Sequence, residues 1–448
     1  MPWPQCNNTI NEVGDELVKA EKPLWKNFTF HHFGLFICAC FGGLAMLIAL
    51  WLIFQHATHY SKPWEQRHII RILFMIPVYA VVSFLSYLFF THAVYFEVIR
   101  DCYEAFAIAA FFTLMCHYLE PTLHDQKNYF RQLQPKNWVW PVNWYQKCTG
   151  GRHKGMFRIP KSGLTWFNIV WVCVFQYCFI RVFFTFVSLI TEFFDRYCES
   201  SLSPAFARIW VQVFEGVSVT IAMYFLIQFY IQLRGDLAAF KPGLKILCIK
   251  LVIFFSFWQT MVISFLASTS GPLQPTATLA YPDIKVGIPS MLLCVEMAIF
   301  AVMHVFAFSA KPYYLSKAGP SDYPEPGVPG TSATKYHGGF LGVLALVDAF
   351  NPWDIIKASA RGFRWLFVGV KHRKMDESYN KYNGSEDYDN DTGYHGGMSY
   401  ASSGADGKGD SATELGVVGA KEDRTGLLNA SQPPGYSPGP YQPYKPYE

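Results

Sequence analysis

The chain has 448 residues, of which 51% belong to the hydrophobic set, 18% are aromatic and only 16% are charged. Soluble chains carry about 25% charged residues, so the composition argues against a cytosolic enzyme, a nucleic-acid-binding module or a disulfide-stapled secreted domain. The formal net charge of +4 is too small to indicate a particular partner. We therefore expect a polytopic membrane protein that binds no nucleic acid.

Long apolar stretches separated by polar segments fill much of the chain. A helix needs about 20 mostly apolar residues to cross the ~30 Å core of a bilayer. Seven stretches qualify, which predicts an all-α fold with transmembrane helices at 33–55, 69–91, 94–119, 164–190, 206–232, 244–268 and 286–309. The third is the least regular, because Glu97, Arg100, Asp101 and Glu104 occupy its first half.

Lys and Arg are concentrated in the loops that follow the first, third, fifth and seventh predicted spans. The positive-inside rule makes those loops cytosolic. Residues 1–32 are then lumenal or extracellular, and the C-terminus is cytosolic. Sequons at Asn7 and Asn27 fall in the outside segment, although the same pattern recurs in the C-terminal tail. Cys6 and Cys198 also lie outside, where an oxidising lumen would allow a disulfide between them.

Three further regions follow the last predicted span: a Pro/Gly/Ser linker (310–339), an amphipathic helix (340–374) and a disordered cytosolic tail (375–448). Asn351 and Pro352 suit the N-cap and the first helical position. An apolar stripe then runs beside basic residues: Trp353, Ile356, Ala360, Phe363, Phe367 and Val370, flanked by Lys357, Arg361, Arg364 and Lys371. The pattern predicts a membrane-surface helix that contacts anionic headgroups. Packing beneath the transmembrane helices is an equally weighted alternative.

Ionisable side chains inside membrane spans are costly and usually face a cavity or a partner. At 1.5 Å per residue, four of them lie roughly 14 Å from the outer ends of their helices: Glu104, Arg181, Glu215 and Glu296. Gln259 lies at a similar depth and Gln176 lies deeper. We interpret these residues as a polar layer in which Arg181 neutralises the negative group of a solute. The alternative is a set of structural pairs that fixes helix register.

Patterns that indicate chemistry at a cofactor or metal do not stand out. The His residues lack the spacing of di-iron boxes, and neither a phosphate-binding Gly-rich loop nor a nucleophile elbow is present in the sequence. We therefore expect no catalytic residues, no metal and no cofactor. Lys245 and Lys250 lie in the cytosolic third of the sixth span, where we expect their side chains to extend toward the headgroups.

Four strings in order resemble the family of the organic solute transporter alpha subunit: PVYAVVSFLSY (Pro77 to Tyr87), RDCYEAFAI (Arg100 to Ile108), QYCFIR (Gln176 to Arg181) and FKPGLKILCIKLVIFFSFWQ (Phe240 to Gln259). The likeness is closest to the transmembrane protein 184 branch, and the long tail is typical of a fungal member. The resemblance marks these family-motif positions: Arg100, Asp101, Glu104, Gln176, Arg181, Lys245, Lys250 and Gln259.

The resemblance implies facilitated transport of bile acids, steroid conjugates and related amphipathic anions, with a single-span beta-type partner. It also implies, through the transmembrane protein 184 branch, a vacuolar or endolysosomal membrane and a link to autophagy. We expect a transporter of amphipathic organic anions or lipids, alone, as a homo-oligomer or with a beta-type subunit. The alternative is a vacuolar scaffold that recruits autophagy or ubiquitin-ligase machinery.

Two short motifs favour partner recruitment. Pro433, Pro434 and Tyr436 form a PPxY-type ligand for the WW domains of ubiquitin ligases. Trp353 and Ile356 fit the aromatic-x-x-aliphatic core that docks the ubiquitin-like autophagy protein, with Asp348 and Asp354 as acidic neighbours. Because Trp353 and Ile356 also belong to the apolar stripe, the sequence leaves open which role they serve.

Overall fold

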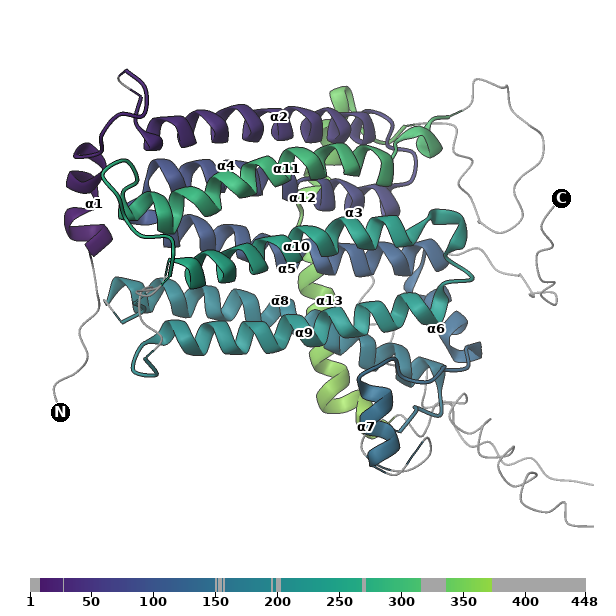
Figure 1. Cartoon of the computed structure of the whole chain (residues 1–448). Helices are drawn as coiled ribbons and strands as arrows, with labels where there is room; N and C mark the ends of the chain where they lie inside the picture. The colour runs from purple at the N-terminus through teal and green to yellow at the C-terminus, as the bar shows by residue number, and fades with distance from the viewer. Residues whose placement is uncertain are drawn as a thin grey trace, which may run out of the picture. The chain divides into compact units, whose positions relative to one another are not determined.

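The computed structural model describes residues 9–26, 28–149, 151, 155, 158–194, 196–198, 203–267, 271–315 and 336–372. These residues fold almost entirely into helices, which agrees with the predicted all-α class. Long helices lie side by side in Figure 1 and alternate in direction. They are α2 (Phe30–Thr58), α3 (Pro63–Leu73), α4 (Met75–Leu88), α5 (Ala93–Leu119), α8 (Gly163–Phe193), α9 (Ala207–Leu233), α10 (Pro242–Leu266) and α11 (Ile288–Ala307).

Shorter helices lie at the two ends of the long ones and along their side. They are α1 (Thr9–Lys19), α6 (Leu123–Gln132), α7 (Val142–Cys148), α12 (Val343–Phe350), α13 (Trp353–Arg364) and α14 (Val370–His372), with the single turns η1 (Phe90–His92), η2 (Ala238–Phe240), η3 (Asp283–Gly287), η4 (Lys311–Tyr313), η5 (Phe340–Gly342) and η6 (Trp365–Gly369). We call the end where α2 begins the α1 end, and the opposite end the α6 end (Figure 1).

Among the described residues, six helices are long and apolar enough to cross a membrane: Phe30–Thr58, Pro63–Leu88, Phe90–Leu119, Gly163–Phe193, Ala207–Leu233 and Asp283–Ala307. The predicted span 244–268 corresponds to α10, a helix of 25 residues. Several α10 side chains lie outside the described set, and α10 is not one of the six. The seventh span therefore stays a prediction.

The second span is interrupted, which the sequence interpretation did not foresee. Helix α3 ends at Leu73 and α4 begins at Met75, with Phe74 between them. Pro77 lies four residues after Leu73, so it offers no N–H to the Leu73 carbonyl and its ring crowds that carbonyl. The break follows from this local chemistry, and the helical segment begins at Pro63 rather than near 69.

Helix α5 lies at the centre of the packing. It contacts α3 and α4 on one side and α8 on the other, while α9 packs on α8, and α10 and α2 pack on α11. Fully buried small residues on α5, such as Ala109 and Ala110, allow neighbouring helices to approach closely. The Phe112 ring packs edge-on against Phe229 of α9, with centroids 5.0 Å apart. This core fixes the helices that carry the polar side chains.

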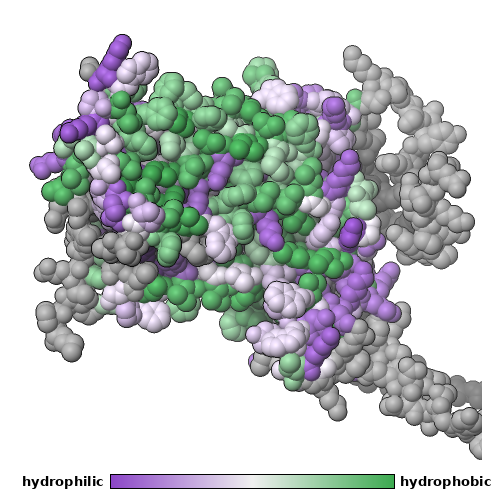
Figure 2. Space-filling view, in the orientation of Figure 1, coloured by the Kyte–Doolittle hydropathy of each residue, from purple (hydrophilic) through white to green (hydrophobic). Residues whose placement is uncertain are grey.

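Apolar side chains also cover much of the outside. Figure 2 shows a broad hydrophobic surface over the long helices, with hydrophilic residues gathered toward both ends and in a few isolated patches between them. Large exposed apolar side chains include Leu47 and Trp51 of α2 and Phe214 and Val217 of α9. An apolar surface of this extent is unfavourable in water and suits a lipid environment.

The predicted amphipathic helix 340–374 is not one helix. It consists of η5, α12, α13, η6 and α14, with a break at Asn351 and Pro352. Asn351 is extended because it precedes a proline, and its side-chain oxygen accepts a hydrogen bond from the Trp353 N–H at 3.1 Å. The predicted helix start is therefore close to the observed start of α13, and the segment before it forms a separate helix.

Helix α13 packs against α8 through small residues. Ala358 and Gly362, four positions apart, are buried, and the indole of Trp171 on α8 donates to the Ala358 carbonyl at 3.0 Å. Small residues at this spacing let two helices lie close together. The predicted apolar stripe is divided: Trp353 and Phe367 are exposed, whereas the Phe363 ring packs edge-on against Phe179 of α8 with centroids 4.9 Å apart. One face of the segment therefore packs on the bundle, and the membrane-surface role of the exposed residues stays a prediction.

Candidate functional site

An arginine of α8 holds acidic side chains from two neighbouring helices. Arg181 Nη2 lies 2.8 Å from Asp101 Oδ2 of α5, and its Nη1 pairs with a carboxylate oxygen of Glu215 on α9. Its Nε also donates to the Asp101 backbone carbonyl at 3.2 Å. Each nitrogen of the guanidinium therefore has a partner.

Asp101 also binds a second arginine on its own helix. Arg100 Nε donates to Asp101 Oδ1 at 3.0 Å, so the two oxygens of this carboxylate serve different guanidinium groups. The Arg100 guanidinium lies 5.9 Å from the centroid of the Tyr79 ring, a cation–π geometry. We call Arg100, Asp101, Arg181 and Glu215 the arginine network.

Glu104, one turn further along α5, is held by two tyrosines rather than by an arginine. Tyr79 of α4 donates to Oε2 and Tyr177 of α8 donates to Oε1, each at 3.0 Å. Two hydroxyl donors compensate part of the cost of burying a carboxylate. Glu104 therefore joins α4, α5 and α8 at a level next to the arginine network.

Gln176 makes a reciprocal contact with α9. Its Nε2 donates to the Ser218 carbonyl at 2.9 Å, and the Ser218 hydroxyl donates to Gln176 Oε1 at 2.8 Å. Both polar ends of the amide are thus used within the helix pair. This contact fixes the register of α8 against α9, as the structural alternative for the polar layer proposed.

Glu296 and Gln259 do not share hydrogen bonds with these groups. They lie on α11 and α10, which pack together. Glu296 Oε2 and Gln259 Oε1 are both buried, and neither has a hydrogen-bond partner among the described residues. The residues of the predicted polar layer therefore form two sets. One is the arginine network with Glu104, on α5, α8 and α9. The other consists of Gln259 on α10 and Glu296 on α11, each with a buried oxygen that has no hydrogen-bond partner within the described ranges.

The arginine network is partly open at its edge. The side chain of Arg181 is 11% exposed, but those of Asp101 and Glu215 are 29% and 16% exposed. A guanidinium held by carboxylates can exchange one of them for another oxyanion of similar geometry, since carboxylate, sulfate and phosphate all accept its forked N–H donors. The arrangement thus combines a nearly buried cation with two carboxylates that are partly exposed.

The two lysines of α10 differ from each other. Lys245 is buried; its Nζ donates to the Phe240 carbonyl at 2.7 Å and lies 4.8 Å from the centroid of the Tyr118 ring. Lys250 is exposed. The expectation that both side chains extend toward headgroups is wrong for Lys245, because the Phe240 carbonyl at the end of η2 and the neighbouring aromatic rings hold its ammonium inside the protein.

Sequence reasoning missed Arg71 of α3. Its side chain is buried, its Nη1 and Nη2 bind the two oxygens of Asp354 at 2.7 and 2.9 Å, and Nη2 also donates to the Asn351 carbonyl. Nε donates to the Ala349 carbonyl. The signal was present, because an arginine inside the apolar run HIIRILF requires a partner. The partner lies 283 residues away and could not be identified without the fold.

The partner-binding candidates of α13 are divided between its two faces. Trp353 and Ile356 are 56% and 50% exposed. Their acidic neighbours point inward, since Asp354 binds Arg71 and Asp348 accepts the Tyr60 hydroxyl at 2.6 Å. The basic residues remain outside: Lys357, Arg361 and Arg364 are all exposed, and the Arg361 guanidinium stacks 5.2 Å from the centroid of the Trp171 ring.

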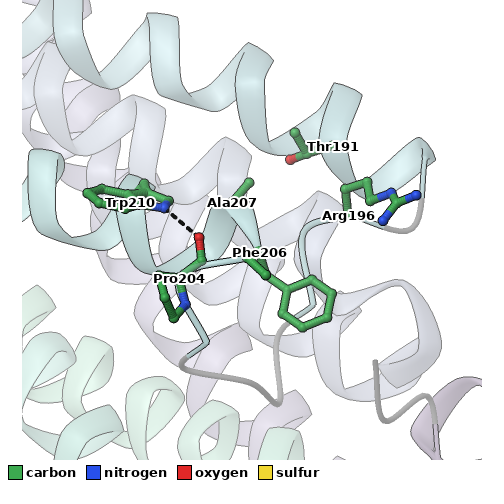
Figure 3. A pocket seen from close by; sticks show the side chains of 7 residues that line it. Thr191, Arg196, Pro204, Phe206, Ala207 and Trp210 are labelled. Carbon is green, nitrogen blue, oxygen red and sulfur yellow. Dashed lines mark hydrogen bonds between the residues drawn. The ribbon is translucent and has the colours of Figure 1, made fainter. Parts of the chain in front are cut away.

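A separate pocket opens at the α1 end between α8 and α9 (Figure 3). Its cavity measures about 460 Å³ and is lined by Thr191, Arg196, Pro204, Ala205, Phe206, Ala207 and Trp210. The Trp210 indole donates to the Pro204 carbonyl at 2.9 Å, as Figure 3 shows. Arg181 lies ten residues before Thr191, about 15 Å along the helix, so this pocket is distinct from the arginine network.

Several predicted sites lie outside the described residues: Pro433, Pro434, Tyr436, Asn7, Asn27 and Cys6. Cys198, the other cysteine considered for an outer disulfide, is disulfide-bonded. Across the described ranges, no group of three or more His, Cys, Asp or Glu side chains could hold a metal ion.

Long antiparallel helices, an apolar outer surface and charges paired inside it define a multi-pass α-helical integral membrane protein. Comparison with known families makes the assignment more specific. The chain belongs to the organic solute transporter Ostalpha family, whose model matches residues 34–313. This match includes each long helix except the first turn of α2, and it ends after α11.

Curated relatives agree with this assignment. A "Transmembrane protein 184 homolog" of Dictyostelium discoideum is 34% identical over 279 residues, which are 61% of this chain and 52% of the relative. A "Protein LAZ1 homolog 1" of Arabidopsis thaliana is 31% identical over 278 residues, 60% of this chain and 56% of the relative. The chain thus aligns with about half the length of these relatives. No solved structure matches it.

Proposed function

We propose that this chain is a facilitative transporter of amphipathic organic anions or lipids. In this proposal seven helices span the membrane, with the N-terminus outside and the C-terminus in the cytosol. The observation that carries the proposal is the arginine network, a guanidinium with exchangeable carboxylate partners inside the apolar length of the candidate spans. Membership of a family described as organic solute transporters supports the same conclusion.

Arg181 would bind the negative group of the solute by exchanging one carboxylate. The contact with Glu215 is the better candidate for exchange, because Asp101 has two further bonds. Its Oδ1 accepts from Arg100 Nε, and its backbone carbonyl accepts from Arg181 Nε. The displaced Glu215 would then limit how long the anion stays, because it competes for the same guanidinium. A site that binds too tightly cannot release its solute, so this competition favours transport over capture.

Uptake into liposomes tests the proposal. Purified full-length protein in liposomes should take up a labelled steroid sulfate with saturation, and Arg181→Ala should reduce the initial rate by about tenfold or more, the loss expected for a charge-assisted contact. Arg234→Ala is the matched control, because Arg234 is an exposed arginine at the end of α9. A rate that is the same in both variants would contradict the assigned role of Arg181.

Loss of the fold must be separated from loss of the site. Arg181→Lys keeps a positive charge but cannot make forked contacts, so it should fold more readily than Arg181→Ala and still transport more slowly than the wild type. Equal melting temperatures for Arg181→Lys and the wild type, together with equal uptake, would argue against the proposed exchange.

A scaffold is the second candidate function, and the exposed face of α13 favours it. Trp353 and Ile356 point outward on one helix turn while Asp348 and Asp354 are used inside. The proposed partner is the ubiquitin-like autophagy protein at a vacuolar or endolysosomal membrane, as suggested by the fungal-type likeness. A WW-domain ubiquitin ligase at Pro433, Pro434 and Tyr436 belongs to the same proposal.

Point substitutions test the scaffold better than removal of residues 340–448, which would uncover the surfaces of α3 and α8. Trp353→Ala with Ile356→Ala should weaken binding of the autophagy protein to nanodisc-embedded protein at least about tenfold, as expected for anchor residues. Val347→Ala, also at an exposed apolar position on the neighbouring helix, should leave it unchanged. Equal binding by both variants would argue against docking at α13.

Lipids are the remaining proposed partner. The exposed apolar residues of α12 and α13 lie beside Lys357, Arg361 and Arg364, while both acidic residues of these helices are turned inward. This distribution suits an anionic leaflet. A homo-oligomer or a single-span beta-type subunit is proposed on the family likeness alone.

A further inference from the structure

An acidic residue connects the N-terminal segment to the turn before α11. Glu21, which follows α1, is only 8% exposed. Its Oε1 accepts the Ala280 N–H at 2.8 Å, and its Oε2 accepts the His31 N–H at a longer 3.4 Å. The next residue continues the contact, since the Lys22 N–H donates to the Ala277 carbonyl at 2.7 Å.

A second carboxyl contacts the same histidine as Glu21. The side chain of Asp283 at the start of η3 is fully buried, and its Oδ1 lies 2.8 Å from Nδ1 of His31. Its other oxygen, Oδ2, is buried and has no hydrogen-bond partner among the described residues. Burial, together with the neighbouring Asp283 carboxyl, raises the pKa of Glu21 to about 7.

Two ionised carboxylates cannot hydrogen-bond to each other, because each is only an acceptor. A single proton on Glu21 changes this, since its O–H can donate to the unsatisfied Oδ2 of Asp283. Oε2 of Glu21 is the oxygen free to carry that proton, because its contact with His31 is the weaker of the two. A proton on Glu21 thus provides the hydrogen-bond donor that Asp283 Oδ2 lacks among the described residues.

Within the described residues, the apolar contacts of α1 with the bundle are few. Val18 packs on a small apolar cluster of Phe90, Ala93 and Val286, and Gly14 faces the Phe90 ring. The contact is too small to fix an 11-residue helix by apolar burial alone. The polar contact at Glu21 therefore has a large influence on whether α1 stays in place.

We propose that Glu21 and Asp283 form a proton-binding site that holds the α1 segment against the start of α11. With one shared proton the segment is closed. When the proton is lost, two adjacent carboxylates repel each other and the segment opens. The site lies at the end of the bundle opposite α6 and does not depend on the arginine network or on the proposed transport.

Other groups surround the pair and must be considered. Tyr87 of α4 is the main one: its ring packs 4.9 Å from His31, between Gly34 and Gly287, and its buried hydroxyl also has no hydrogen-bond partner among the described residues. This hydroxyl is the rival donor to Asp283. Other titratable or charged groups of the adjoining elements are Asp15, Glu16, Lys19, Lys22, His31, His32, His92, Tyr281 and Lys285.

Hydrogen exchange of the full-length protein in nanodiscs tests the proposal, with amide exchange followed by mass spectrometry on peptides within residues 9–26 between pH 5.5 and 8.5. After correction for intrinsic rates, protection should fall about tenfold or more as pH rises through about 7, the factor that corresponds to one pH unit of linkage. Glu21→Gln should stay protected throughout, because its amide donates to Asp283 without a titrating proton.

Three further variants decide between explanations. Asp283→Asn should also remove the pH dependence, since its amide can donate to ionised Glu21. Glu16→Gln, which removes a charge from an exposed position of α1, and Tyr87→Phe should both keep the transition. A flat wild-type profile, an unchanged transition in Glu21→Gln, or a transition abolished by Tyr87→Phe would each overturn the proposal.

Discussion

Arg71 of α3 forms a bidentate salt bridge with Asp354 of α13, in which Nη1 donates to Oδ2 at 2.7 Å and Nη2 donates to Oδ1 at 2.9 Å. The same guanidinium binds the Ala349 and Asn351 carbonyls where α12 ends. A helix C-terminus carries partial negative charge. One buried arginine therefore compensates both the carbonyls at the C-terminus of α12 and the Asp354 carboxylate in the first turn of α13. It therefore fixes the C-terminal helices to the bundle.

Removing this contact should release α13. In Asp354→Asn the buried Arg71 loses its counter-charge, which should cost about 3 kcal/mol, the lower end for a broken buried pair because the Asp354 side chain is 30% exposed. The expected result is a lower melting temperature and faster proteolysis between residues 350 and 372. Lys357→Gln is the control, since Lys357 is exposed on the same helix; equal effects of the two changes would contradict the assignment.

Because α13 packs closely on α8, only a small side chain should be tolerated in place of Gly362. A Cβ at this position would lie 3.6 Å from Trp171 Cδ1, an ordinary contact. Gly362→Ala should therefore change the melting temperature little or raise it slightly, because alanine favours a helix by up to about 1 kcal/mol. Gly362→Leu should displace α13, seen as an increase in proteolysis. Tolerance of leucine without change would mean that this helix does not pack on α8.

Each of the two tyrosines that donate to Glu104 should contribute to the free energy of unfolding. The loss in the double variant should be smaller than the sum of the two single losses. Tyr79→Phe or Tyr177→Phe removes one hydroxyl donor from a buried carboxylate, at an expected cost of about 1 to 3 kcal/mol. Because both act on one group, a double-mutant cycle of thermal unfolding should show coupling of about 0.5 kcal/mol or more. Strict additivity would show that the two hydroxyl groups do not share Glu104.

The raised pKa of Glu21 also predicts how overall stability depends on pH. Burial raises this pKa to about 7 from an ordinary 4.5, so the folded protein holds the proton more strongly than the unfolded chain. The stabilisation is fully present at acidic pH, declines as pH rises from about 4.5 and is lost above about 7. The melting temperature of the wild type should fall over this range more than that of Glu21→Gln; a rise would contradict this sign.

The sequence predicted the elements that depend on local composition and missed those that depend on distant contacts. Long, mostly apolar runs such as 164–190 had only one membrane-compatible conformation, and α8 contains that run. The charged first half of α5 was the least regular prediction, and the reason is now visible: Asp101 and Glu104 find partners on the neighbouring helices α4 and α8. Such partners cannot be assigned from spacing alone.

For the candidate site too, the sequence predicted some relationships between residues and missed others. Counting depth along each helix placed Arg181 and Glu215 at one level, and they pair. The same count included Glu296, which lies at that level on a different side of the bundle, because depth gives no information on rotation about the bundle axis. The stripe on α13 includes Phe363, which packs on Phe179 of α8, but most of the contact is made by small residues beside the stripe, whose signal in a hydropathy pattern is weak.

The most direct test of the central claim is equilibrium binding of a labelled steroid sulfate to the purified protein and to Glu215→Gln. Neutralising Glu215 removes the anion that competes for Arg181, so the account predicts tighter binding by Glu215→Gln, by about fivefold or more, and loss of binding in Arg181→Ala. Unchanged affinity in Glu215→Gln, or undiminished binding by Arg181→Ala, would contradict it.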